Sequence, residues 1–334
     1  MDKGVEKGKR LEEGENSMNQ IIEDFFAKEN GKEESGEDLI KSGFVSIVGL
    51  PNAGKSTLLN ALVGQKIAIT SKKAQTTRNQ IMAVYDDERG QIVFHDTPGI
   101  HKAENKLSVY MESVAEKALG SGDLILFLVD ATAEKGKKEE QVLSLLSHSK
   151  RKILLVLNKI DLLEEAAVER KKAEYARSLP FVATVSVSAY RKSGLEELLD
   201  TIFAFLPYGP RYYDADTVTD LPVREITREL IREQALYKLD KEIPHGIAVL
   251  VESMQERKNG IWDVKATIVC EKESHKGIII GKAGSMLKSI GSGARIQIEK
   301  LLEAKVNLQL FVKVRKDWRE NPAYLQEYGY KEQK

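Results

Sequence analysis

Between residues 44 and 207, short apolar runs alternate with segments whose apolar residues recur every three or four positions. Continuous apolar runs are typical of strands buried on both faces, and the longer period is typical of helices packed against a sheet. The pattern predicts strands at 44–48, 80–86, 91–96, 124–130, 152–158 and 181–186. It predicts helices at 57–63, 108–119, 138–146, 166–178 and 195–205. This alternation favours an α/β fold, a doubly wound and mostly parallel sheet with helices on both faces.

The order of elements changes after residue 222, to α–β–β–α–α–β, which predicts a second, α+β domain. Its expected helices are 223–239, 275–280 and 285–303, and its expected strands are 246–255, 261–271 and 306–314. In the last strand every second residue is apolar, so one face should be buried; these residues are Val306, Leu308, Leu310, Val312 and Val314. The polar residues 316–334 contain Trp318 and Tyr324, which predicts a short docked tail.

The first 41 residues are rich in Glu, Lys, Gly, Asn and Ser, a composition typical of disorder. Four apolar residues interrupt it at helical spacing: Ile21, Ile22, Phe25 and Phe26. They fit either a transient helix in a solvated tail or a short docking helix. Because residues 208–222 contain Pro and several Asp, they read as a linker. The expected division is therefore an extension at 1–41, a first domain at 42–207, the linker, and a second domain at 223–334.

The composition of the chain does not point to a function, but it excludes several classes of site. The 334 residues carry 51 basic and 51 acidic side chains, so a nucleic-acid surface would have to come from local clustering. The single Cys270 excludes an internal disulfide and a thiolate zinc cluster, which fits a reducing compartment. The five histidines show no metal-binding spacing, and the best apolar run, 124–129, falls short of the roughly 18 residues that span a bilayer. The basic N-terminus is followed by no apolar stretch and is not a secretory signal.

The most informative segment is GLPNAGKS at 49–56, which fits the pattern GxxxxGK[ST] between a strand and a helix. Its glycines let the backbone fold into a nest of N–H donors that the helix N-terminus extends, which suits a phosphate. Lys55 can reach the terminal phosphates, and the Ser56 hydroxyl can bind Mg²⁺. The nucleotide-binding residues expected here are Gly49, Asn52, Ala53, Gly54, Lys55, Ser56 and Thr57.

Two further elements belong to the phosphate end of the same site. In DTPG at 96–99, Asp96 can hold Mg²⁺ through water, and the Gly99 N–H can point at the γ-phosphate. Thr77, in AQTTR at 74–78, can offer Mg²⁺ a second hydroxyl. The expected metal ligands are therefore Ser56, Thr77 and Asp96, and the expected catalytic residues are Lys55, Thr77 and Gly99.

The last two elements would recognise the base. In NKID at 158–161, formed by Asn158, Lys159 and Asp161, the Asp161 carboxylate can accept two hydrogen bonds from guanine. Adenine would leave that carboxylate unpaired, which disfavours an ATPase. Ser188 and Ala189 follow the final strand and can give a backbone N–H to the guanine carbonyl. Each motif alone is weak, but five in this order at strand ends are typical of a GTP-hydrolysing P-loop protein.

With these motifs, residues 42–334 resemble the translation-factor class of P-loop GTPases and, in particular, the Era family of bacterial GTPases. The resemblance implies hydrolysis of GTP to GDP and phosphate, and switch segments around 70–80 and 97–107. Where Ras-type GTPases carry a glutamine, this chain has Ile100, which cannot orient water, as in the Era-like families. Unaided hydrolysis should therefore be slow. In related GTPases an asparagine at the position of Asn52 coordinates K⁺; Asn52 either does so here or only stabilises the loop turn.

The second domain carries a GxxG motif at 281–284, typical of KH domains, where the short loop admits a nucleic-acid backbone. The α–β–β–α–α–β order resembles the prokaryotic KH variant. Residues 278–280, Leu287 and Ile290 are expected to line the groove for the bases. Between residues 276 and 319 stand ten basic and three acidic side chains, and the segment 312–319 resembles the C-terminal signature of the Era family. The expected RNA contacts are Lys276, Gly281, Lys282, Ala283, Gly284, Lys288, Arg315, Lys316, Trp318 and Arg319, with Trp318 exposed.

The resemblance implies that the RNA is the 3′ end of small-subunit ribosomal RNA and that the role is maturation of the small ribosomal subunit. It implies a cytoplasmic, monomeric protein with Mg²⁺ as cofactor, and it allows peripheral association with the cytoplasmic side of the cell membrane. The alternative is a membrane-associated GTPase switch that uses the basic C-terminal face to contact anionic lipid. The two differ in one feature, because RNA clamping needs the GxxG loop and lipid attraction needs only charge.

Overall fold

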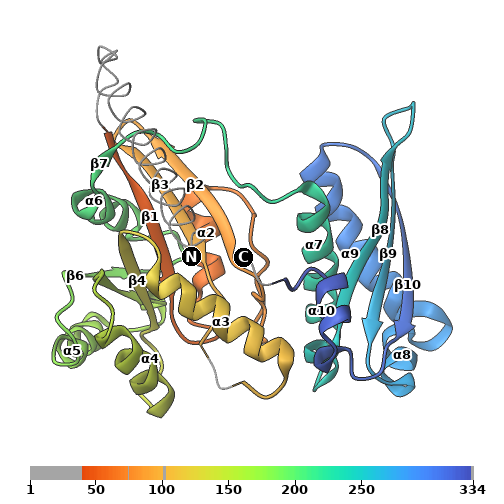
Figure 1. Cartoon of the computed structure of the whole chain (residues 1–334), viewed down its shortest axis with the longest axis horizontal. Coiled ribbons are helices and arrows are strands. Elements are labelled where there is room, and N and C mark those ends of the chain that lie inside the picture. Colours follow the sequence, from red (N-terminus) through yellow and green to blue (C-terminus); the bar gives the residue numbers. More distant parts are fainter. Residues whose placement is uncertain (1–39, 74, 101–102, 332–334) are drawn as a thin grey trace, which may run out of the picture. The chain divides into compact units, whose positions relative to one another are not determined.

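The computed structural model describes residues 40–73, 75–100 and 103–331 (Figure 1). Its larger sheet has the strand order β2-β3-β1-β4-β5-β6, with the short β7 added beside β1. The strands are β1 (Ile40–Val48), β2 (Ile81–Asp87), β3 (Gly90–Asp96), β4 (Leu124–Asp130), β5 (Lys152–Asn158), β6 (Ala183–Val187) and β7 (Tyr208–Gly209). The apolar patch at residues 21–26 lies outside the described residues, and β1 begins two residues before the expected domain boundary.

Each strand in the series β3-β1-β4-β5-β6 is parallel to the next, and β2 at the edge is antiparallel to β3. The helices between them are α2 (Lys55–Val63), α3 (Lys106–Gly120), α4 (Lys137–Ser147), α5 (Glu165–Ala176) and α6 (Leu195–Phe205). One apolar cluster joins the sheet to α2 and α6, and another joins its opposite face to α4 and α5. The predicted doubly wound, mostly parallel sheet is confirmed, and its carboxyl strand ends meet along one edge.

The segment expected as a linker is tied to the edge of this sheet. Strand β7 pairs with β1 in antiparallel fashion, and Val84 donates its N–H to the carbonyl of Val218 over 2.9 Å. The Gln91 side chain accepts hydrogen bonds from the backbone N–H groups of Tyr212 and Tyr213, at 2.8 and 3.0 Å. The sequence did not predict β7 because two residues carry no hydrophobic period.

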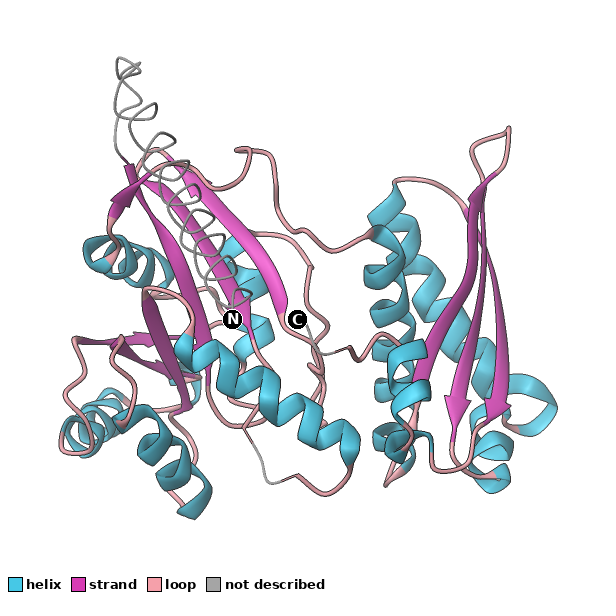
Figure 2. Ribbon diagram, viewed as in Figure 1, coloured by secondary structure: helices cyan, strands magenta, loops and turns pink. Residues whose placement is uncertain are grey.

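The second sheet has the order β10-β9-β8, in which β8 is antiparallel and β10 parallel to β9. Its strands are β8 (Ala248–Glu256), β9 (Trp262–Cys270) and β10 (Val306–Val314), and its helices are α7 (Val223–Lys238), α8 (Glu273–Ile280) and α9 (Ser285–Leu302). Helices α7 and α9 lie side by side against one face of the sheet (Figure 2). The predicted α–β–β–α–α–β order is confirmed. The alternating apolar residues of β10 pack into the same core as expected.

The C-terminal residues fold back as a docked tail that includes α10 (Pro322–Glu327), whose first N–H groups are capped by the Asn321 side chain. Trp318 is fully buried, stacked with Tyr330 and edge-on to Tyr328. The same cluster contains Leu107 and Met111 of α3. Residues from Ile40 onward therefore form one unit. Within the described ranges, no helix combines the length and apolarity needed to cross a membrane.

Candidate nucleotide and RNA sites

The phosphate loop follows β1 and ends where α2 begins. Gly54, the residue before the helix, has φ 99°, and a Cβ there would lie 2.3 Å from the Asn158 amide nitrogen, so only glycine fits. The loop lines a pocket with an empty volume of about 420 Å³. Its lining includes Asn52, Gly54, Lys55, Ser56, Thr57, Thr77 and Gly99. These expected residues come from three different segments, and the fold brings them to one end of the sheet.

Lys55 is buried beneath the loop. Its ammonium donates to the carbonyl oxygens of Gly49 and Leu50, over 3.2 and 3.1 Å. Burial lowers the pKa of Lys55 to about 8, although the nearby Asp96 opposes this shift. An ammonium has three N–H donors, so the two loop carbonyls leave one for a phosphate.

Three oxygen-bearing side chains meet beside Lys55. The Ser56 hydroxyl lies 2.6 Å from Asp96 Oδ2 and 2.8 Å from the Thr77 hydroxyl, which is itself 3.3 Å from Asp96 Oδ2. Burial raises the pKa of Asp96. Asp96 Oδ1 is buried and has no hydrogen-bond partner within the described part of the chain. Hard oxygen ligands with an unpartnered carboxylate oxygen fit Mg²⁺, so the three predicted ligands form a plausible site for that ion.

Asn158 connects the phosphate loop to the expected base-binding end. Its buried side chain donates to the carbonyl of Ala53 over 2.9 Å and accepts the N–H of Ala189 over 3.0 Å. Ser188 donates its hydroxyl to Asp161 Oδ1 over 2.6 Å and its N–H to the carbonyl of Ser193. Ser188 and Ala189 thus brace the site, and donation of one of their N–H groups to guanine stays a prediction.

The Asp161 carboxylate is exposed, as a group that meets the base should be. Next to it, Lys159 has φ 68° and its ammonium pairs with Asp130. Burial alone would raise the pKa of Asp130, but hydrogen bonds from Lys159 and Thr132 outweigh burial and lower it. Lys159 is therefore held in place by its charged end.

Ile100 sits where a water-orienting side chain would be needed. It packs against the apolar cluster on the α4 and α5 side of the sheet, and its N–H donates to the Gly49 carbonyl over 3.4 Å. The side chain thus supports the sheet and takes no part in the chemistry.

In the second domain, α8 ends at the GxxG loop. Gly281 has φ 74°, and a Cβ there would lie 2.7 Å from the Cβ of Met286, so the turn requires glycine. Lys282 and Ala283 between the glycines are exposed, and Ala283 itself has φ 50°. The loop therefore presents bare backbone and one ammonium to a ligand.

A groove with an empty volume of about 690 Å³ runs from this loop; its lining is Gly284, Leu287, Lys288, Gly291, Ser292, Arg295, Leu308 and Leu310. The prediction that Leu287 lines this groove is confirmed. The same prediction is wrong for Ile279 and Ile290, which are fully buried in the domain core. On α9, Leu287, Gly291 and Arg295 recur every four residues and share the groove side of the helix, whereas Ile290 packs into the domain core.

The expected basic contacts divide into two groups. Lys282, Lys288 and Lys316 are exposed, and Lys276 and Arg315 are half-buried. Arg319 instead pairs with Glu271, its Nη2 2.6 Å from Glu271 Oε2. The prediction of an exposed Trp318 is wrong, because its indole N–H donates to the Gly246 carbonyl over 3.0 Å inside the aromatic cluster of the tail.

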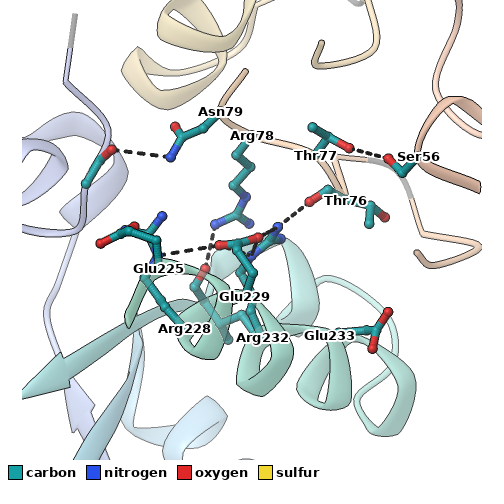
Figure 3. A network of polar contacts seen from close by, with 12 residues as sticks. Ser56, Thr76, Thr77, Arg78, Asn79, Glu225, Arg228, Glu229, Arg232 and Glu233 are labelled. Atoms are coloured by element: carbon teal, nitrogen blue, oxygen red, sulfur yellow. Dashed lines mark hydrogen bonds and ion pairs between the residues drawn. The ribbon is translucent and has the colours of Figure 1, made fainter. Parts of the chain in front are cut away.

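Sequence reasoning missed three buried charged residues that surround the segment containing Thr77: Arg78, Arg232 and Glu233 (Figure 3). Arg78 stands in the quoted motif, but nothing marked it as buried. On α7 the segment 228–233 carries four Arg and Glu side chains, and charged side chains on a helix are usually on its solvated face, so nothing in the sequence marks them as buried. One signal could have revealed the burial. A helix that packs on a sheet needs a buried face, and this segment has too few apolar residues to form that face without its charged side chains.

Fold and site together define a P-loop GTPase joined to a KH domain. Residues 44–159 match the family described as 50S ribosome-binding GTPase, and residues 242–319 match the KH domain family. The chain is 46% identical over 294 residues to GTPase Era of Ruminiclostridium cellulolyticum, covering 88% of this chain and 99% of the relative. It is 49% identical to GTPase Era of Geotalea uraniireducens with the same coverage. The chain therefore belongs to the GTPase Era family and is a GTP hydrolase.

Two solved structures match this chain along nearly their whole length. A single-residue variant of Aquifex aeolicus Era bound to GDP·AlF4⁻ matches with a TM-score of 0.84 and 37% identity, over 87% of this chain and 99% of that one. Era in complex with MgGDPNP and nucleotides 1506–1542 of 16S ribosomal RNA matches with a TM-score of 0.84, 36% identity and the same coverage. Mg²⁺ accompanies the nucleotide in that relative, which agrees with the oxygen cluster at Asp96.

Proposed function

We propose that this chain binds the 3′ end of small-subunit ribosomal RNA through its KH domain and acts in maturation of the small ribosomal subunit. The observation that carries the proposal is the exposed Lys282 in the glycine loop, next to a groove that both leucines and basic side chains line. A relative of 36% identity in complex with 16S ribosomal RNA nucleotides supports it. The test is crosslinking of the full chain, loaded with a non-hydrolysable GTP analogue, to total ribosomal RNA. Crosslinks should concentrate at the 3′ end of the small-subunit RNA, and an even spread would contradict the proposal.

Hydrolysis at this site would depend on positioned charge. Lys55 would place its ammonium at the terminal phosphates, and the loop N–H groups around Gly54 would surround them. Ser56, Thr77 and Asp96 would hold Mg²⁺, which neutralises charge on the β- and γ-phosphates. Because Ile100 cannot orient the attacking water, unaided turnover should be slow, and a group from a partner would accelerate it.

Guanine selection should depend on Asp161. Changing Asp161→Asn is expected to weaken GTP binding and relax the preference for guanine, because the amide turns a donor toward the ring N–H. Losing a charged hydrogen-bond partner commonly costs about 1.5–3 kcal/mol, or roughly 10- to 150-fold in affinity. Competition of GTP and ATP for a fluorescent nucleotide measures both effects. Glu165→Gln, at an exposed carboxylate nearby, is the control. ATP competing as well as GTP with the unmutated chain would contradict the assignment.

We further propose that Asn52 coordinates K⁺ beside the phosphates. Asn52 is exposed, has φ 67° and lines the phosphate pocket, so its side chain is available to a cation there. Hydrolysis should then be faster in KCl than in NaCl at equal ionic strength, and Asn52→Ala should remove the difference. Phosphate release in the two salts measures this. Equal rates for the unmutated chain would favour the alternative, in which Asn52 only stabilises the turn.

We also propose that the protein works in the cytoplasm, since its proposed partner is ribosomal RNA. The resemblance to the Era family further suggests a monomer, which gel filtration of the full chain would test. Peripheral contact with the inner face of the cell membrane remains a second proposal, supported by the exposed lysines around the GxxG loop. Vesicle binding, measured beside RNA binding as described in the Discussion, separates the two functions.

A further inference from the structure

Residues 70–73 and 75–79, here called switch I, lie between two sets of contacts. On one side Thr77 touches the metal-binding residues Ser56 and Asp96, at 2.8 and 3.3 Å. On the other side the same segment meets helix α7 and the C-terminal tail (Figure 3). Switch I is therefore part of the nucleotide site and of the contact with the KH domain.

The beginning of switch I is held by Glu233 of α7, whose side chain is fully buried. Its Oε1 accepts the N–H of Thr70 over 2.9 Å, and its Oε2 accepts the Lys66 ammonium over 2.5 Å. Both carboxylate oxygens are thus engaged by the GTPase domain, although Glu233 belongs to the other domain.

The end of switch I is held on both sides of Thr77. The fully buried guanidinium of Arg232 donates to the carbonyl of Thr76 and is itself oriented by Glu229, with Nε 3.0 Å from Oε2. Arg78 donates to the carbonyls of Ile247 and His245, over 2.7 and 3.1 Å, and to the Tyr330 hydroxyl over 3.0 Å.

Asn79 extends the contact to a third element. Its Nδ2 donates to the carbonyl of Gly329 in the tail over 3.4 Å, and its Oδ1 accepts the Tyr110 hydroxyl of α3 over 3.0 Å. The residues just before and after Thr77 therefore make buried, charged contacts that exist only while the KH domain is in place. Removing one partner of such contacts is costly, because it leaves a charge or an N–H buried without a partner.

We propose that helix α7 is a latch on switch I, in which Arg232 and Glu233 are positioning residues that hold Thr77 at the metal end of the nucleotide site. The inference deepens the GTPase function and rests on it. In P-loop GTPases the γ-phosphate and its Mg²⁺ order the switch segments and hydrolysis releases them, so a latch that holds Thr77 at the metal end should favour GTP over GDP. By linkage, GTP must favour the latched arrangement of the KH domain to the same extent.

The test compares nucleotide affinities of the full chain carrying Arg232→Met with Glu233→Leu. The Kd for a non-hydrolysable GTP analogue should rise about tenfold, which is within the usual range of coupling between sites, while the Kd for GDP stays unchanged. The control is Arg224→Met on the same helix, since the side-chain hydrogen bonds of Arg224 go to the carbonyls of Val251 and Glu252 within the KH domain. The control should change neither Kd.

Unchanged affinity for both nucleotides, or an equal loss for both, would overturn the latch and leave the GTPase function standing. If the double variant does not fold, hydrogen exchange on the unmutated chain tests the proposal instead. Replacing GDP by the analogue should protect peptides over switch I and over α7 together. Protection of switch I alone would overturn the proposal. Turnover of GTP by the unmutated chain, measured in the same series, reports separately on the GTPase assignment.

Discussion

Replacing Lys55 by alanine is expected to abolish GTP hydrolysis. The ammonium is the only side-chain cation buried under the phosphate loop among the described residues, held there by the carbonyls of Gly49 and Leu50. Loss of one oriented donor to a transition state commonly costs about 100- to 1000-fold in rate, and here a positive charge is lost as well. Single-turnover phosphate release measures the effect, with GDP affinity measured beside it to separate binding from chemistry.

The fold should survive this change, which makes the loss of activity interpretable. Burial lowers the pKa of Lys55 to about 8, so the charged form is already disfavoured by its surroundings and alanine removes that cost. The control is Ile100→Ala, which should keep substantial activity because Ile100 packs against the sheet and does no chemistry. Hydrolysis by the Lys55 variant at close to the original rate, or an equal loss in both variants, would contradict the proposed roles.

The nucleotide site could be predicted from the sequence because its parts are short motifs at strand ends. In a parallel sheet these ends meet along one edge, so Asp96 and Asn158 could be placed near the phosphate loop without any knowledge of distances. The structure then shows contacts that no motif states, such as the two hydrogen bonds of Asn158. The order of the motifs along the chain was therefore enough to predict which residues form the nucleotide site. The hydrogen bonds between those residues depend on tertiary packing and could not be predicted.

Trp318 shows where this reasoning fails. It stands among basic residues at 313–319, which reads as an exposed RNA surface. Its burial depends on Tyr328, on Tyr330 and on helix α3, elements whose approach no local pattern encodes. Arg78 was missed for the same reason, since its acceptors come from residues 245–247 and 330. Contacts between segments far apart in the sequence determine the burial of Trp318 and of Arg78, so neither could be predicted from the spacing of residues.

Introducing Lys282→Asp with Ala283→Asp is expected to abolish binding of single-stranded RNA and leave GTP binding intact. The two exposed residues stand between the glycines of the GxxG loop, where a ligand backbone must approach closely. Added carboxylates block that approach and repel phosphate. Changing a surrounding lysine alone, for example Lys288→Ala, should instead flatten the salt dependence of binding by about one counterion. Filter-binding titrations at two salt concentrations measure both effects.

The matched control is Lys258→Asp with Asn259→Asp, which makes the same change in charge at an exposed turn between β8 and β9 of the same domain. If both double variants lose RNA equally, overall charge explains binding and the loop has no special role. If the loop variant binds RNA as tightly as the original, the KH assignment of the RNA site fails. Binding to anionic vesicles is measured in parallel. Because lipid attraction needs only charge, the loop variant and the control should bind vesicles equally. A loop variant that loses RNA binding but binds vesicles as the control does would show that the glycine loop serves RNA.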